Sequence, residues 1–172
     1  MIKKTKNSIL KRWSRGIFKV KKAVIGLYII GGFILLSVIG PIIANDPIEF
    51  LGTPLSPPSL EFIFGTNGQG QDVFAQTVAG ARQTLFVGFT TGFLVVMMGA
   101  IIGGASGYFG GRTDDLLSFL INIFLVMPGL PLMVILASWL PPGPGTLIGV
   151  LVLTGWAWNA RVIRSQMMTY RN

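Results

Sequence analysis

The sequence predicts an all-α integral membrane protein with about four transmembrane helices and a cytoplasmic N-terminus. Only 12% of its residues are charged, about half the fraction found in an ordinary soluble domain. Two stretches, 83–111 and 116–160, contain no Asp, Glu, Lys, Arg or His, and each exceeds the ~20 residues that cross a hydrocarbon core. Nine of the fourteen Lys and Arg residues precede Ala23, and such an excess of positive charge marks the cytoplasmic side of a membrane protein.

The N-terminal segment, residues 1–22, is basic and cytoplasmic in this topology. Its apolar residues have the spacing of a short amphipathic helix on the membrane surface, although a solvated tail fits equally well. The net charge of +8 could indicate a nucleic-acid partner. Because the excess charge directly precedes an apolar segment, cytoplasmic retention and contact with anionic lipid headgroups explain it more simply. We therefore expect the lipid bilayer, and no nucleic acid, as the partner of this segment.

Residues 23–44 are predicted to form the first transmembrane helix. The apolar stretch is too long for a signal peptide and has no cleavage-site pattern, so we interpret it as an uncleaved anchor. Residues 45–84 follow as an extracytoplasmic loop, because four prolines exclude a continuous helix and acidic residues outnumber basic ones. Near the end of this loop, Asp72 can cap a helix, and a short amphipathic helix is expected at about residues 73–81.

Residues 85–172 are predicted to hold three further helices, at about 85–106, 116–140 and 146–162, with an inside turn after the first of them. Pro128 and Pro131 should kink or unwind the helix that contains them. Four glycines of the helix at 85–106 lie within roughly 60° of one another on a helical wheel. Such a stripe lets helices approach closely in lipid, and lining a pore is the alternative. The four glycines are Gly88, Gly92, Gly99 and Gly103.

The residue types that are missing restrict the chemistry. The sequence has no phosphate-binding P-loop motif, no Cys and no His, and no charged side chain is predicted at the middle of the membrane. Asp114 and Asp115 stand alone in a turn, so no pair of carboxylates or nucleophile with a base is expected. We therefore expect no catalytic, cofactor-binding or metal-binding residue and no cofactor on this chain. The functions that remain are a passive conduit, a scaffold, or one subunit of a complex in which another chain supplies the energy.

Five segments in order resemble the permease subunits of bacterial ABC importers of the dipeptide, oligopeptide and nickel group, most closely the second of the two permeases in such systems. Residues 64–74 (FGTNGQGQDVF) resemble the family pattern L-G-T-D-x-x-G-R-D-V-L, and residues 80–85 (GARQTL) resemble G-A-R-x-S-L. The segment 106–111 (SGYFGG), followed by Asp115, resembles A-G-Y-x-G-G…D. PGLPL at 128–132 and W…ARVIR at 156–164 complete the series. The sequence departs from the family at Asn67, Gln71, Phe119 and Asn122, where Asp, Arg, Arg and Asp respectively are common.

The resemblance implies a non-catalytic subunit with six helices in the bacterial inner membrane. Its expected partners are a second permease, cytoplasmic ATPase subunits and an extracytoplasmic solute-binding protein. Within it, Gly99, Gly103, Pro128 and Pro131 would shape the path, and Gly88 and Gly92 would pack helices, while Arg161 and Arg164 would orient the segment that couples to the ATPase. The chain ends before the coupling loop of the family, so the alternative is a truncated permease that acts only as a membrane scaffold.

Overall fold

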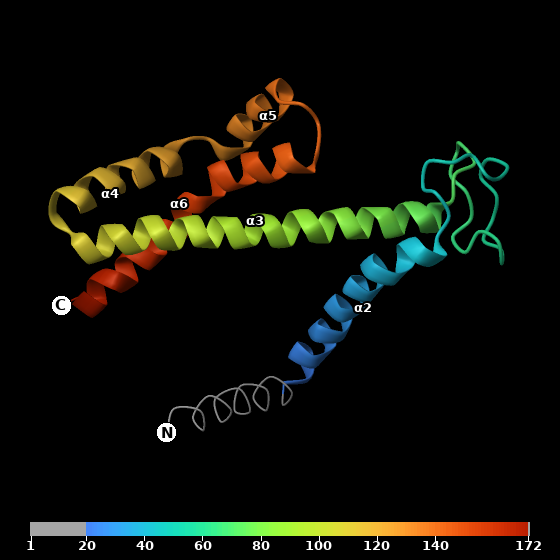
Figure 1. The fold of residues 1–172 in the computed structure, drawn as a ribbon, viewed down its shortest axis with the longest axis horizontal. Helices are drawn as coiled ribbons and strands as arrows, with labels where there is room; N and C mark the ends of the chain where they lie inside the picture. Colours follow the sequence, from blue (N-terminus) through green and yellow to red (C-terminus); the bar gives the residue numbers. More distant parts are fainter. Residues whose placement is uncertain (1–19, 172) are drawn as a thin grey trace. The chain divides into compact units, whose positions relative to one another are not determined.

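The computed structural model describes residues 20–171, and the surface helix considered for the N-terminal segment therefore lies almost entirely outside the described residues. The described part consists of helices joined by loops (Figure 1). The helices are α2 (Lys21–Ile43), α3 (Val73–Phe109), α4 (Gly111–Val126), α5 (Gly129–Trp139) and α6 (Pro144–Arg171). The only β-type pairing among these residues is an isolated bridge between Thr66 and Asp72. The prediction of an all-α protein is confirmed.

Helices α2, α3 and α6 are each long and apolar enough to cross a bilayer, and α4 with α5 makes a fourth span if the bent pair is counted as one. This number agrees with the four transmembrane helices expected from the sequence. The chain divides into two compact units, one ending at Leu85 and the other beginning at Phe86. We describe each of them by itself.

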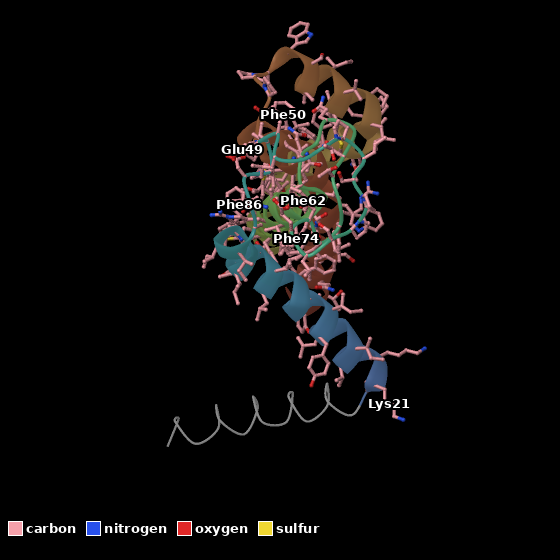
Figure 2. All side chains as sticks on the ribbon, turned by 90° about the vertical axis from the view of Figure 1, so that its right-hand side faces the viewer. Lys21, Glu49, Phe50, Phe62, Phe74 and Phe86 are labelled. Carbon is pink, nitrogen blue, oxygen red and sulfur yellow. The ribbon has the colours of Figure 1, made fainter. Side chains whose placement is uncertain are left out.

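In the first unit, α2 packs against the start of α3 at one small contact. Gly40 is the buried residue of α2, and a Cβ atom built on it would lie 2.5 Å from Cγ1 of Val78. Most other large side chains of α2 are exposed, as expected of a helix surrounded by lipid. Figure 2 shows Lys21 at one end of α2 and the loop residues Glu49, Phe50 and Phe62 at the other.

The loop between α2 and α3 is ordered by hydrogen bonds from side chains to the backbone. The Thr66 hydroxyl donates to the carbonyl of Thr53 at 2.6 Å and accepts from the Ser56 N–H at 2.9 Å. The Gln71 amide donates to the carbonyl of Ile48 at 2.7 Å. Asn67 donates to the Gln71 side chain at 2.9 Å. Two positions where the resemblance implies charged residues thus form a neutral amide pair in this chain.

Asp72 caps α3, as the sequence predicted. Its carboxylate accepts the N–H of Phe74 at 2.9 Å and the side-chain amide of Asn45 at 3.1 Å, and the residue is only 2% exposed. One carboxylate therefore joins the end of the first span to the start of the next.

We expect Asp72→Ala to destabilise the first unit by about 1–2 kcal/mol, because a helix N-cap and a buried acceptor are both lost. Hydrogen exchange of the amides at residues 73–76 in detergent micelles measures the effect. Asp46→Ala is the matched control, since the Asp46 carboxylate accepts the N–H of Ile48 in an exposed turn. Equal acceleration of exchange in both variants would contradict the capping role.

The boundaries of α3 differ from the expected ones. In place of a short amphipathic helix in the loop and a separate span at 85–106, residues 73–109 form one helix of 37 residues. No proline occurs between Pro58 and Pro128, so nothing in this stretch removes a backbone donor. The helix ends where Gly110 and Gly111 adopt positive φ angles of 64° and 53°, which glycine reaches without steric cost.

In the second unit, the span expected at 116–140 is divided. Helix α4 begins earlier, at Gly111, and the axes of α4 and α5 differ by 85° across the break at Met127 and Pro128. The predicted interruption is thus confirmed. Helix α6 is longer than the expected 146–162, because no glycine or proline follows Gly155. Both α4 and α5 contact α6 (Figure 1).

Candidate functional site

Helices α3 and α6 approach each other most closely at glycines. A Cβ atom built on Gly99 would lie 2.7 Å from Cβ of Asn159, and one built on Gly103 would overlap the backbone of Ala160. Further along α3, Gly107 lies equally close to Met167 of α6, with 2.7 Å between the two Cβ positions. Three glycines spaced four residues apart therefore let the two backbones touch, which is how helices pack tightly in lipid.

The other two glycines of the predicted stripe, Gly88 and Gly92, have no neighbouring atom within 4 Å of the position that a Cβ atom would take. The structure therefore brings Gly99 and Gly103 together with α6 and leaves Gly88 and Gly92 in open space. It adds Gly107, which was expected in a turn. The repeat of glycine at every fourth residue, 99, 103 and 107, is the signal that could have identified it.

A polar cluster joins α3, α4 and α6 near the Gly110 turn. Arg164 of α6 donates from Nε to Oδ1 of Asp114 at 2.5 Å and from Nη2 to Oδ2 at 2.6 Å. The hydroxyls of Ser106 and Ser118 also donate to Oδ1 of Asp114, at 2.5 Å and 3.1 Å. The Asp114 and Arg164 side chains are 15% and 29% exposed. The expectation that Asp114 stands alone in a turn is wrong, since its carboxylate accepts four hydrogen bonds and forms a bidentate pair.

The second predicted arginine lies in a different environment. Arg161 of α6 donates from Nη2 to Oδ1 of Asn122 at 2.7 Å, and both side chains are exposed in this unit. Asn122 belongs to the fourth turn of α4, beyond the charged residues at the start of that helix. The structure thus separates the two arginines: one is bound to a carboxylate and the other to a neutral amide.

The break between α4 and α5 coincides with Pro128. This residue is the N-cap of α5, with φ −70° and ψ 99°, and it has no N–H with which to continue α4. Pro131 was expected to contribute to the interruption, but it lies in the first turn of α5, where a missing N–H removes no helical hydrogen bond. Pro128 therefore ends α4 and caps α5, while Pro131 is accommodated in the first turn of α5.

A compact apolar core lies between α4 and α6. Trp156 of α6 is 1% exposed, and its ring packs against Phe124 of α4 with 5.1 Å between the ring centroids. Ile121, Ala157 and Ala160 complete the buried cluster. Trp156 is thus a core residue of this unit. The core holds α4 against α6, and so it positions both the Asp114–Arg164 pair and the Arg161–Asn122 pair.

Comparison with known proteins supports the resemblance. Residues 95–172 match the family model described as the binding-protein-dependent transport system inner membrane component. The chain is 36% identical over 162 residues to a dipeptide transport system permease protein of Bacillus subtilis, which covers 93% of the chain and 50% of that relative. It is 35% identical over 156 residues to an oligopeptide transport system permease protein of the same organism, covering 88% of the chain and 50% of the relative. The similarity to these permeases that the sequence motifs predicted is therefore confirmed.

Similarity to the binding-protein-dependent permeases accounts for the long apolar helices and places the chain in the bacterial inner membrane as a multi-pass, non-catalytic component. A further relative, an oligopeptide transport system permease protein of Mycobacterium tuberculosis, is 31% identical over 128 residues, which is 73% of the chain and 44% of the relative. The chain spans about half the length of these curated relatives. The family model covers α4, α5, α6 and the end of α3. This part of the chain contains the Asp114–Arg164 ion pair and the hydrogen bond between Arg161 and Asn122.

Proposed function

We propose that this chain is part of the transmembrane permease of an ABC importer for peptides or related small solutes. The observation that carries the proposal is similarity over 93% of the chain to a dipeptide transport system permease protein. The permease forms the translocation path, while separate subunits hydrolyse ATP. The chain itself needs no cofactor for this role.

The polar cluster supports a mechanical role for the end of α6. Asp114 and Ser106 fix Arg164 to the ends of α3 and α4, so the last turns of α6 cannot rotate without breaking a bidentate ion pair. The positive-inside rule puts this arginine-bearing end in the cytoplasm, where the ATPase subunits act. Arg164 therefore orients the segment that transmits their movement to the membrane helices.

The glycine contacts and the helix break support a path through the second unit. Gly99 and Gly103 fix the distance between α3 and α6, and the break at Pro128 divides a candidate membrane span into α4 and α5. Interrupted helices in transporters expose backbone groups that can face a solute. Gly99, Gly103, Pro128 and Pro131 thus shape the path in this proposal, and Gly88 and Gly92 remain available for packing against another subunit.

Copurification tests the proposal. We expect the tagged permease that contains this chain, extracted gently from bacterial membranes, to bring with it an ATPase subunit and a second permease, and to bind a solute-binding protein added from the extracytoplasmic side. Mass spectrometry of the eluate identifies these partners. An eluate with neither an ATPase nor a second permease would refute the assignment to an importer.

A further inference from the structure

Three neutral amide side chains join the segment after α2 to the start of α3. Oε1 of Gln71 accepts hydrogen bonds from Nδ2 of Asn67 and from Nε2 of Gln76, both at 2.9 Å. Nε2 of Gln71 donates to the carbonyl of Ile48 at 2.7 Å, and Nε2 of Gln76 also donates to the carbonyl of Pro47 at 3.2 Å. We refer to Asn67, Gln71 and Gln76 as the amide clamp.

The amide clamp connects three segments of the first unit, namely the residues that follow α2, the turn at 67–71 and the first turn of α3. Gln71 is its centre, since its side chain makes three of these hydrogen bonds and the residue is only 8% exposed. The turn itself is closed by Oδ1 of Asn67, which accepts the N–H groups of Gln69 and Gln71 at 2.8 Å and 3.1 Å. Loss of the Gln71 amide would therefore leave partly buried polar groups without a partner, which is costly.

The bonds of the amide clamp join neutral groups. They run between amide side chains and backbone carbonyls, and residues 45–72 contain no Lys or Arg. The acid next to the clamp, Asp72, accepts from the N–H of Phe74 and the amide of Asn45, which are neutral as well. Salt screens interactions between charges, with a Debye length of about 10 Å at 0.1 M and about 3 Å at 1 M. A hydrogen bond between two neutral groups is hardly affected by this screening.

We propose that the amide clamp holds the first span to the start of α3 with a strength that does not depend on the salt concentration outside the cell. The positive-inside rule puts this loop on the extracytoplasmic side. Positions 67 and 71 are those at which the resemblance implies an acid and a base. An ion pair there would close the same turn, but its strength would fall as salt rises. The inference concerns the first unit alone and is independent of the proposed import function.

Hydrogen exchange of the full chain in micelles of an uncharged detergent tests the proposal. The reporters are the N–H groups of Leu51 and Gly52, which donate to the carbonyl of Gly70, and that of Asn67, which donates to the carbonyl of Gln71. In the wild type, raising NaCl from about 0.05 M to about 1 M should change their exchange rates by less than about 1.5-fold. Asn67→Asp combined with Gln71→Arg replaces the neutral contact with an ion pair. In that double variant the rates should rise roughly 2- to 5-fold over the same range, as expected for a screened surface pair.

Gln71→Leu tests whether Gln71 is the centre of the amide clamp. The substitution keeps the approximate size of the side chain and removes its three hydrogen bonds. Exchange at the reporter N–H groups should therefore accelerate roughly 10- to 100-fold, the range expected when buried polar groups lose their partners. Gln69→Leu is the matched control, because it makes the same change at an exposed position of the same turn. Its rates should stay within about 2-fold of the wild type.

Asn67→Asp alone should also accelerate exchange, because the new carboxylate would face Oε1 of Gln71 and Oε1 of Gln76, and adding Gln71→Arg should reverse part of this loss. A wild type whose exchange rises with salt as much as that of the double variant would overturn the inference. Equal exchange in Gln71→Leu and Gln69→Leu would overturn it as well. The salt series on the wild type needs no substitution, so it decides the question even where a variant does not fold.

Discussion

Replacing Gly103 with alanine is expected to lower the free energy of unfolding of the second unit by about 2–3 kcal/mol, the upper part of the range for overpacking. The new methyl group would overlap the backbone of Ala160, and Ala160 is fully buried in the core beside Trp156. A backbone neighbour cannot rotate away as a flexible side chain could. The two helices must therefore separate, which also loosens the contact at Gly99.

Gly104→Ala provides the matched control on the adjacent residue. A Cβ atom on Gly104 meets nothing within 4 Å, and alanine is favoured over glycine inside a helix by up to about 1 kcal/mol. This variant should be as stable as the wild type or slightly more stable. Unfolding in mixed detergent micelles with increasing SDS, followed by tryptophan fluorescence, measures both variants. Equal stability of the two would mean that α3 and α6 do not touch at Gly103.

The helices were the predictable part of this fold. Lipid excludes unpaired backbone groups, so long uncharged stretches such as 116–160 had to become helices, and Pro128 had to interrupt one of them. The boundaries of the helices were less predictable, because a helix continues until a residue or a turn breaks it. Nothing between Asp72 and Gly110 breaks α3, so the expected loop helix and the following span are one element.

The candidate site was less accessible from the sequence, because its partners are far apart along the chain. Arg164 and Asp114 are separated by 50 residues, and Arg161 and Asn122 by 39. Both arginines were singled out as functional, but no local pattern shows which carboxylate or amide each one meets. Periodicity also placed four glycines on one face, yet only the position of α6 decides that Gly99 and Gly103 make contact while Gly88 and Gly92 do not.

Removing the Asp114 carboxylate should have the other large effect. Asp114→Ala leaves the Arg164 guanidinium and two serine hydroxyls without their acceptor, and breaking a fully buried ion pair in this way costs about 3–5 kcal/mol. Because the two side chains retain 15% and 29% exposure, solvent screens part of the interaction. We therefore expect a loss of about 2–3 kcal/mol in the same micelle assay.

Asp115 provides the matched control for Asp114, and a double-mutant cycle tests whether Asp114 acts through its ion pair with Arg164. The Asp115 side chain is exposed and accepts no hydrogen bond in the described part of the chain, so Asp115→Ala should change stability by less than about 0.5 kcal/mol. Arg164→Met should destabilise on its own, and combining it with Asp114→Ala should cost less than the sum of the single changes, because no unpaired charge then remains. Additive effects would mean that the carboxylate stabilises the Gly110 turn through its serine contacts, and that the end of α6 is not held by the ion pair.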